Sequence, residues 1–537
     1  MPRSEAVAKG EIRLRFHGAA QAVTGSCFAL QTSEANILVD CGLFQGSKTE
    51  KELNYRPFPF TPASVDAVLL THAHIDHSGL LPKLAKDGFV GPIFATAATI
   101  DLCSVMLPDS GHIQEMEVEQ LNRRNARRGR PMVQAIYDAE QALATLTQFR
   151  PMPFGTWAPV AKGIRARYWN AGHLLGSASI ELEIDRQGVR PLRLLFSGDI
   201  GPNHKLLQSD PAAPHDLDYV VCEATYGDVD RPDASFERRL QVLRSEVQAA
   251  VKASGVLLIP SFAVERTQEL LVDLVHLMKS GDIPSAPIFV DSPLATKASA
   301  VFEKHSGDIE RGEELRDALR SPQVRFTESA EQSKAIARIR GFHIVMAASG
   351  MCEAGRIRHH LKDWLWREQA TVLLVGFQAQ GTLGRILLDG APRVRLMGEE
   401  VQVRARIRSV DLYSGHADGP ELAAWLAGRQ PVSGSIFLTH GEREAIDGLR
   451  NRLIDAGMGA RVVVPTLDSA FDLSAEAAHQ IKHEEPVRIA ADSAGRRDWH
   501  NDLSKLILDI DEAVAKAVDE RARKQIIRQL RKALAPD

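Results

Sequence analysis

The stretch Thr71-His72-Ala73-His74-Ile75-Asp76-His77-Ser78-Gly79 decides the fold of this 537-residue chain and indicates its chemistry. It follows the nearly continuous apolar run 65–70, which predicts a buried strand. Imidazole and carboxylate groups are ligands of zinc and similar first-row metals. A single histidine near a strand end is ordinarily a satisfied polar residue, but three histidines and an aspartate at H-x-H-x-D-H spacing are not a common accident. The stretch therefore predicts a metal site.

The spacing within this stretch favours two metal ions. Side chains alternate along an extended backbone, so we expect His72 and His74 to point the same way. Asp76 and His77 follow the bend and face a second ion about 3.5–4 Å from the first, which is the separation in two-metal hydrolases.

The composition is that of a globular chain with a sizeable core. Hydrophobic residues make up 44% and charged residues 25%, and the length suggests about three domains. The net charge of −4 gives no general signal for nucleic acid, although a basic patch on one face would suffice. No apolar stretch approaches the ~20 residues of a membrane span, and residues 1–10 lack an apolar signal core. The five cysteines form no C-x-x-C pair, which predicts free thiols and a cytoplasmic location.

Several predicted strands in the first part of the chain end on side chains that can bind metals or protons. Apolar or alternating runs predict strands at 12–16, 27–30, 36–39, 164–169, 178–184, 192–196 and 219–223. Three of them are followed by Asp40, His173 and Asp199, and the strand 219–223 ends on Glu223. Loops held by a rigid sheet commonly carry a functional site. Residues 100–149 are interpreted as helical, and the basic run 123–130 within them as a solvent-exposed face, with substrate contact as the alternative.

After Asp228 strands alternate with helices, which predicts a parallel α/β sheet. The expected strands are 256–259, 288–290, 343–347 and 371–375, and the expected helices are 235–253, 265–279 and 353–366. A single strand at 401–410 then leads to His416, and strand 435–442 carries His440. We therefore expect domains at 1–229 and 398–474, an inserted domain at 230–397 and a helical C-terminal extension at 475–537. Apolar spacing from 501 to 534 predicts an amphipathic helix for packing or homo-oligomerisation, with an RNA or partner arm as the alternative.

A two-metal hydrolase needs two ligand sets and a bridging group. We assign His72, His74 and His173 to one ion, Asp76, His77 and His440 to the other, and Asp199 to both. Zinc lowers the pKa of bound water from about 15.7 toward about 7, so the expected nucleophile is a hydroxide activated by two zinc ions. Asp40 is expected to fix a ligand histidine by a hydrogen bond, and a simple turn residue is the alternative.

Phosphodiester cleavage also requires a proton for the leaving alkoxide. Asp76 and Asp199 belong to the catalytic centre, and His416 is the candidate acid because imidazole titrates near neutrality. Glu223 is the candidate partner that keeps it protonated. For Glu223 considered alone a structural role is favoured, and for His416 alone the two interpretations are equal.

The motifs resemble a known family. Asp40, the T-H-x-H-x-D-H-S-G stretch, His173 in A-G-H-x-L-G-S and Asp199 in S-G-D-I-G look like the metallo-β-lactamase superfamily. Glu223 in C-E-A-T-Y-G-D, His416 in S-G-H-A-D and His440 in T-H-G-E resemble motifs A, B and C of its β-CASP branch. Segments from Pro260, Asp291, Ala348 and Gly376 also resemble that branch, so that the similarity covers about 11–473.

The resemblance implies an α/β fold: an αββα metallo-β-lactamase sandwich interrupted by a β-CASP domain, with substrate in the cleft between them. Family members include ribonuclease J and the endonuclease of pre-mRNA 3′-end cleavage. RNA-acting members usually carry histidine at motif C, as His440 does here, whereas DNA cross-link repair nucleases usually carry valine.

Four residues of the inserted segment are candidates for substrate binding. Ser349 and Thr382 belong to Gly-containing turns whose N–H groups can bind phosphate, and such turns are as often only turns. Arg356 and Arg385 can contact phosphates as forked donors, with surface ion pairing as the equal alternative.

The predicted function is a zinc-dependent ribonuclease with two zinc ions that hydrolyses single-stranded RNA. Cleavage is expected to be endonucleolytic, with 5′-exonuclease activity as a further option. The alternatives are a metallo-hydrolase of a small thioester or lactam and a non-catalytic RNA-processing scaffold.

Overall fold

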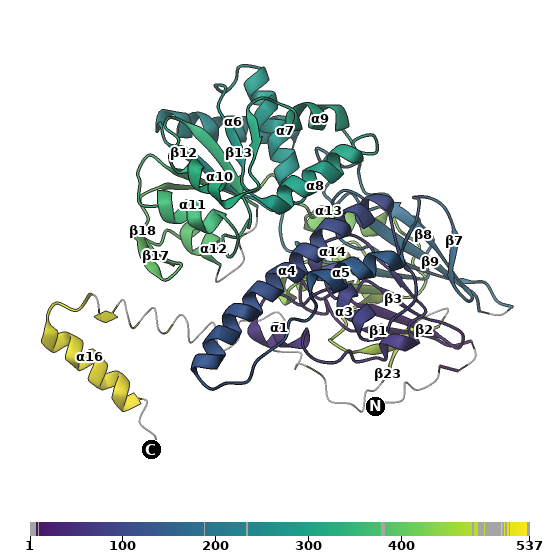
Figure 1. Cartoon of the computed structure of the whole chain (residues 1–537). Helices are drawn as coiled ribbons and strands as arrows, with labels where there is room; N and C mark the ends of the chain where they lie inside the picture. Colours follow the sequence, from purple (N-terminus) through teal and green to yellow (C-terminus); the bar gives the residue numbers. More distant parts are fainter. Residues whose placement is uncertain are drawn as a thin grey trace.

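The structure is a computed structural model with two large α/β parts and a separate C-terminal helix (Figure 1). It describes residues 7–8, 10–186, 188–231, 235–376, 378, 382–474, 477–481, 488, 506, 510, 513–514 and 516–533. Leaving the C-terminal helix aside, the lower part in Figure 1 is built from the first and last segments of the chain. The upper part is built from the segment between them.

The first sheet is mixed and forms one layer of the lower part. Its spatial order is β23 (Ala478–Ile481), β22 (Ala470–Leu473), β1 (Ile12–Phe16), β2 (Phe28–Thr32), β3 (Asn36–Val39), β4 (Ala67–Leu69), β5 (Ile93–Ala95) and β6 (Phe149–Pro151). The pairs from β3 to β6 are parallel, so the carboxyl ends of β3 and β4 share one edge.

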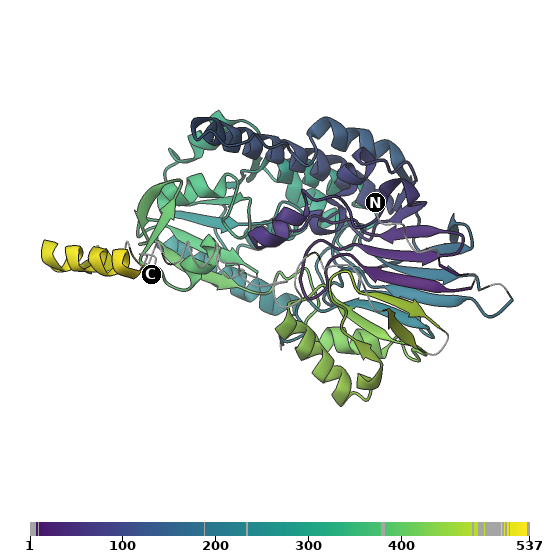
Figure 2. The same ribbon diagram turned by 90° about the horizontal axis from the view of Figure 1, so that it is seen from below.

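The second sheet forms the facing layer. Its order is β21 (Val462–Val463), β20 (Ile436–Thr439), β11 (Tyr219–Glu223), β10 (Leu192–Phe196), β9 (Ala178–Ile184), β8 (Ile164–Asn170) and β7 (Ala158–Ala161). β10, β11 and β20 run parallel, so they end together at one edge. Figure 2 shows the strands of the two sheets stacked as two layers.

The two sheets enclose an aromatic core. Phe16 of β1 lies 5.1 Å, between ring centroids, from Phe437 of β20 and 5.7 Å from Phe471 of β22. Phe28 of β2 lies 5.8 Å from Phe196 of β10. Burying aromatic side chains of this size is a large part of what holds two sheets together.

Helices cover the outer faces of both sheets. The first sheet is covered by α3 (Leu81–Lys86), α4 (Ala97–Arg127) and α5 (Ala139–Thr145), and the second by α13 (Gly419–Ala427) and α14 (Arg443–Asp455). Short helices α1 (Lys48–Leu53) and α2 (Ile75–Ser78) lie in the loops after β3 and β4. This arrangement confirms the predicted αββα sandwich.

The upper part is a parallel sheet surrounded by helices, which confirms the predicted inserted α/β domain. Its strand order is β14 (Val324–Phe326), β13 (Ile288–Val290), β15 (His343–Ala347), β12 (Val256–Pro260), β16 (Thr371–Val375) and β19 (Arg406–Val410). Its helices are α6 (Phe236–Lys252), α7 (Arg266–Lys279), α8 (Pro293–Lys304), α9 (Gly312–Leu319), α10 (Ala330–Ile336), α11 (Ile357–Trp364) and α12 (Leu383–Leu388). α8 packs against α4 of the lower part.

The prediction of one strand over 401–410 is wrong. β17 (Arg393–Leu396) and β18 (Glu399–Gln402) form a separate hairpin, and β19 joins the parallel sheet beside β16. Between β18 and β19 the backbone N–H groups of Arg404 and Ala405 both donate to the Leu365 carbonyl, at 2.8 and 2.9 Å. The chain changes sheets here, although the alternation of side chains continues without a break.

The prediction of one helical stretch over 100–149 is also wrong in its second half. α4 ends at Arg127, and a turn at Gly129 separates it from α5 and β6. The basic run 123–130 therefore covers the exposed end of α4 and the turn. The boundaries at 229/230, 397/398 and 474/475 stay predictions.

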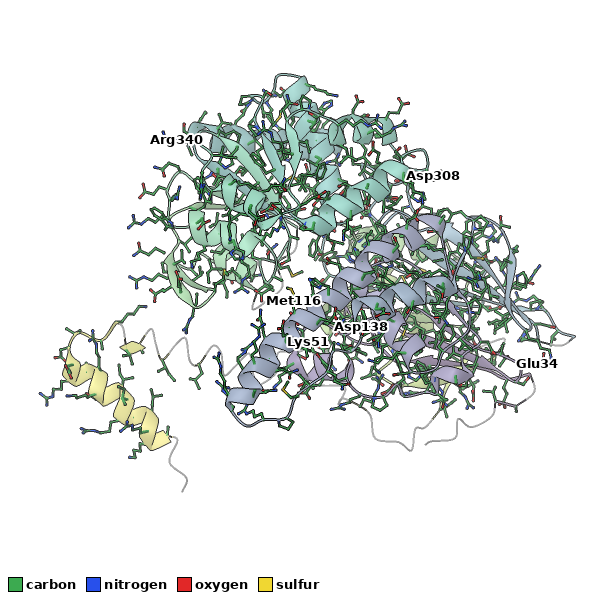
Figure 3. The ribbon with its side chains drawn as sticks, in the orientation of Figure 1. Glu34, Lys51, Met116, Asp138, Asp308 and Arg340 are labelled. Carbon is green, nitrogen blue, oxygen red and sulfur yellow. The ribbon has the colours of Figure 1, made fainter. Side chains whose placement is uncertain are left out.

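The C-terminal helix α16 (Glu520–Ala533) stands apart from the rest, and none of its residues is buried (Figures 1 and 3). Within the amphipathic helix predicted over 501–534, residues 501–505, 507–509, 511–512, 515 and 534 lie outside the described residues, as does Gly381 of the turn before Thr382. Within the described part of the chain, no helix is both long and apolar enough to cross a membrane.

Candidate active site

The histidine stretch lies where the carboxyl end of β4 meets α2. After Leu69 the backbone leaves the sheet, and His74 immediately precedes the short helix that carries Asp76 and His77. Gly42 allows this bend, because a β-carbon there would lie 1.6 Å from the Asp76 carbonyl oxygen. The local fold therefore requires glycine on the neighbouring loop after β3.

One group of potential ligands is formed by His72, His74 and His173. The Nδ1 atom of His74 lies 3.2 Å from Nε2 of His72 and 3.1 Å from Nε2 of His173. Two nitrogens bound tetrahedrally to one zinc ion lie about 3.3 Å apart, given Zn–N bonds of 2.0–2.1 Å. The three nitrogens are therefore spaced as ligands of a single ion.

A second group is formed by Asp76, His77 and His440. Nε2 of His440, at the end of β20, lies 3.2 Å from Nε2 of His77 and 3.7 Å from Oδ2 of Asp76. The ligand atoms of these three side chains all lie within 4.8 Å of one another. Residues separated by more than 360 positions in the chain thus meet at one edge of the sandwich.

Asp199, after β10, lies between the two groups. Oδ2 is 3.4 Å from Nε2 of His72 and 3.7 Å from Nε2 of His173, whereas Oδ1 is 3.3 Å from Nε2 of His77 and 3.5 Å from Nδ1 of His440. Oδ1 is buried and has no hydrogen-bond partner among the described residues. A buried carboxylate oxygen without a donor is costly unless a cation binds it. The donor set and this oxygen both fit metal ions that share Asp199.

Burial keeps the first group of imidazoles ready to bind metal. Burial lowers the pKa of His74 to about 4 and lowers the pKa values of His72 and His173 well below the ordinary value. These rings are therefore neutral at pH 7, and neutral imidazole is the form that binds a metal ion.

Hydrogen bonds from other residues orient the ligand rings. Nδ1 of His77 lies 2.7 Å from Oδ2 of Asp40, which also accepts the hydroxyl hydrogen of Thr71 at 2.8 Å. Nδ1 of His173 donates to the Gly415 carbonyl at 2.6 Å, and Thr225 Oγ1 lies 3.1 Å from Nδ1 of His440. Such partners fix the ring orientation and tautomer of metal-binding histidines.

His416 and Glu223 form a pair next to this centre. Nδ1 of His416 lies 3.2 and 3.3 Å from the two carboxylate oxygens of Glu223, and its Nε2 is 3.9 Å from Oδ2 of Asp199. Glu223 is buried and also accepts the Thr225 N–H at 3.2 Å. These distances show that Nε2 of His416 faces the centre, while Glu223 contacts the opposite side of the ring. The His416 side chain is also partly exposed.

Three family models match the chain. They are the metallo-beta-lactamase superfamily over residues 20–94, the Beta-Casp domain over 267–387 and the Zn-dependent metallo-hydrolase RNA specificity domain over 400–465. Ribonuclease TTHA0252 of Thermus thermophilus is 35% identical over 443 residues, which cover 81% of this chain and 94% of the relative. The chain belongs to the β-CASP family of the metallo-β-lactamase superfamily. The predicted family and the predicted class, a metal-dependent nuclease, are thereby confirmed.

Other relatives of this β-CASP chain carry different names. Transcription termination factor FttA of Cenarchaeum symbiosum is 30% identical over 465 residues, 83% of this chain and 69% of the relative. The RNase J-like protein of Methanocaldococcus jannaschii is 27% identical over 439 residues, 80% of this chain and 93% of the relative.

The four candidate substrate-binding residues of the β-CASP domain already have partners within the chain. Arg356 donates to Asp291 at 2.7 Å and to the Glu328 carbonyl at 2.7 Å, and Arg385 pairs with Asp389 at 2.9 Å. Ser349 accepts the Ala354 N–H within its loop, and the Thr382 side chain caps α12 by accepting the Arg385 N–H. Their role in substrate binding stays a prediction.

Three parts of the site were not predicted from the sequence: Thr71, Thr225 and the Gly415 carbonyl. Each orients a ligand ring that was predicted. Thr71 and Gly415 each lie within a quoted motif, but no spacing rule identifies which neighbour of a histidine turns toward its ring. Only the folded backbone brings Thr225 of the loop after β11 against His440 of the loop after β20.

Proposed function

We propose that this β-CASP chain is a ribonuclease that hydrolyses phosphodiester bonds of single-stranded RNA with two zinc ions bound in the candidate site. The observation that carries the proposal is the convergence of six potential ligands around a seventh, Asp199, beside the His416–Glu223 pair. His72, His74 and His173 would hold one ion, Asp76, His77 and His440 the other, and Asp199 both. Such ions supply a nucleophile from water at neutral pH and neutralise charge on the phosphoryl group.

The protein side chains contribute orientation and proton transfer. Asp40, the Gly415 carbonyl and Thr225 hold the ligand rings, so that the site does not reorganise during the reaction. His416 donates a proton from Nε2 to the leaving oxygen, and Glu223 orients the ring through Nδ1. This division leaves His416 outside the ligand set.

RNA as the substrate is supported by the comparisons. The matched segment 400–465, which carries His416 and His440, has a model described as an RNA specificity domain, and the Thermus relative is named a ribonuclease. Endonucleolytic cleavage, a cytoplasmic location and oligomer formation through α16 belong to the same proposal.

Incubation with labelled linear and circular single-stranded RNA tests the proposed function. We expect cleavage of both RNAs, complete loss of cleavage after treatment with a zinc chelator, and recovery on adding zinc, because the proposed nucleophile is water activated by the bound ions. Circular RNA separates endonuclease from exonuclease action because it has no end. Cleavage that survives the removal of all metal would refute the metal-dependent proposal, and hydrolysis of a thioester or lactam without RNA cleavage would favour a small-substrate hydrolase.

A further inference from the structure

Glu265 begins α7 in a backbone conformation that is unusual for a residue with a β-carbon. Its φ and ψ angles are 68° and −63°, and the Arg266 N–H donates to the Val264 carbonyl at 2.9 Å. These features define a γ-turn of the positive-φ form, which is rare and strained. A strained backbone of this kind persists only where surrounding contacts hold the residue in place. Packing of the helix alone does not require it.

The Glu265 side chain crosses from the β-CASP domain to the sandwich domain. It is only 6% exposed. Its carboxylate accepts the Leu175 N–H at 3.1 Å and the Gln208 side-chain amide at 3.0 Å, and it pairs with Nζ of Lys205 at 3.2 Å. All three donors belong to the sandwich domain, so one buried carboxylate receives three contacts across the domain boundary.

Two of these donors lead directly to the metal-site loop. Leu175 follows His173 by two positions, and the Lys205 ammonium donates to the His173 carbonyl as well as to Glu265. The other side of His173 is held by the Gly415 carbonyl. Glu265 of the β-CASP domain therefore holds the backbone around His173 through Leu175 and Lys205, whereas the Gly415 carbonyl holds its ring.

A second interdomain contact, between α8 and α4, is an exposed ion pair with which the buried Glu265 contact can be compared. Lys304 and His305 at the end of α8 contact Asp101 of α4 at 2.7 and 2.5 Å. Lys304 is largely exposed, and among the described residues Asp101 makes no hydrogen bond or ion pair with a potential metal ligand. The Glu265 contact differs because it is buried, starts from a strained residue and ends on the loop that carries His173.

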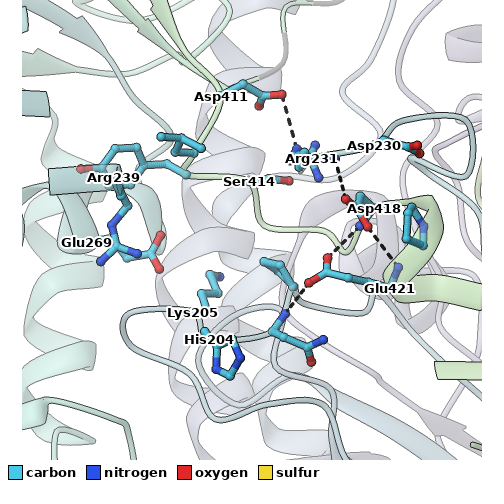
Figure 4. A pocket seen from close by; sticks show the side chains of 15 residues that line it. His204, Lys205, Asp230, Arg231, Arg239, Glu269, Asp411, Ser414, Asp418 and Glu421 are labelled. Atoms are coloured by element: carbon cyan, nitrogen blue, oxygen red, sulfur yellow. Dashed lines mark hydrogen bonds and ion pairs between the residues drawn. The ribbon is translucent and has the colours of Figure 1, made fainter. Parts of the chain in front are cut away.

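We propose that Glu265 is a positioning residue that links the placement of the β-CASP domain to the placement of His173. The proposal rests on the proposed function in one respect, the assignment of His173 as a metal ligand. Lys205 and the α7 residue Glu269 also line a cavity of about 310 Å³ between the domains (Figure 4). Because Lys205 lies at this boundary, a movement of the β-CASP domain away from the sandwich would withdraw the carboxylate from both Lys205 and Leu175.

Four variants distinguish the effect of losing the carboxylate from the effect of backbone strain and from the effect of weaker contact between the domains. Glu265→Gly removes the carboxylate and relieves the backbone, Glu265→Ala removes the carboxylate and keeps the strain, and Glu265→Gln keeps an acceptor for the Leu175 N–H. Lys304→Ala is the matched control, because it removes an exposed interdomain ion pair that, among the described residues, makes no hydrogen bond to the loop carrying His173. Thermal unfolding of each metal-free variant reports whether the fold is intact.

The readouts are zinc affinity, measured by competition with a chelator, and the visible spectrum of the Co²⁺-substituted protein. We expect Glu265→Gly and Glu265→Ala to weaken one of the two metal equivalents by about 10–100-fold and to shift the Co²⁺ bands, as for other partners of metal ligands. Glu265→Gln should lose less, and Lys304→Ala should match the wild type. A merely structural role would lower the unfolding temperature without changing the affinity or the spectrum.

The proposal would be overturned if Glu265→Gly and Glu265→Ala both kept the zinc affinity and the Co²⁺ spectrum of the wild type. An equal loss of zinc affinity in Lys304→Ala would also overturn it, as would a wild-type protein that binds no metal. The RNA assay keeps the two proposals distinguishable. If the wild type binds two metal equivalents but cleaves no RNA, the proposed function fails while the variants still test Glu265. If the wild type cleaves RNA and the variants bind metal normally, only the role of Glu265 fails.

Discussion

Replacing Asp199 by asparagine is expected to lower the rate of RNA cleavage by at least about 10³-fold, because this carboxylate stands between both ligand groups. Its two oxygens lie within 3.3 to 3.7 Å of four histidine rings. The amide has the same shape but carries no charge, and one of its two atoms cannot act as a ligand. The loss should therefore appear in metal content as well as in rate, whereas the fold should persist because the sandwich core does not include Asp199.

Elemental analysis of the purified protein and a single-turnover cleavage assay measure these two effects. The matched control is Asp455→Asn, which makes the same chemical change at an exposed position at the end of α14. The control should keep full activity and metal content. An Asp199→Asn protein that retains two metal equivalents and cleaves RNA within about tenfold of the wild type would show that Asp199 does not join the two groups.

Replacing His416 by alanine is expected to lower RNA cleavage by about 10²–10⁴-fold while metal content stays at the wild-type level. The reason is geometric: His416 is held by Glu223 at 3.2 Å and lies outside the potential ligand groups. Its loss removes the proton donor and leaves every proposed ligand in place. Glu223→Gln should show a smaller loss in the same direction, because the ring would keep a partner without a charge.

A substrate with a p-nitrophenolate leaving group isolates the role of His416, because this group departs without a proton. We expect the His416→Ala defect on such a phosphodiester to shrink to less than about tenfold. His215→Ala, at an exposed histidine, is the control and should match the wild type on both substrates. An equal defect on both substrates would assign His416 to substrate binding, and a parallel loss of metal would assign it to the ligand set.

The sequence predicts the potential metal ligands of this site better than it predicts the groups that orient them. Four of the seven potential ligands lie within residues 72–77, and the remaining three each follow a recognisable apolar strand, so strand-end chemistry could be inferred without coordinates. That the ligand atoms would actually meet depends on both sheets ending at a common edge. The sequence alone indicates this only through resemblance to a family.

Other features depend on contacts that have no local sequence pattern. Side chains alternate through 401–410 as in one strand, yet hydrogen bonds to the Leu365 carbonyl divide the segment between two sheets. Glu265 looked like the first residue of a helix, whereas its positive φ and its contacts with Lys205 and Leu175 arise from packing between domains. Arg356 looked available for phosphate, but Asp291, which lies far away in the sequence, pairs with it. Arg385 instead pairs locally with Asp389, four positions later, as in the alternative of surface ion pairing.

Zinc titration of the metal-free protein, with simultaneous measurement of RNA cleavage, shows whether one site holds two ions that share Asp199. We expect two tightly bound equivalents per chain, with full activity reached only when the second has bound. Full activity at one equivalent, or two equivalents bound with unchanged affinity by the Asp199→Asn protein, would show that the two ions do not share Asp199.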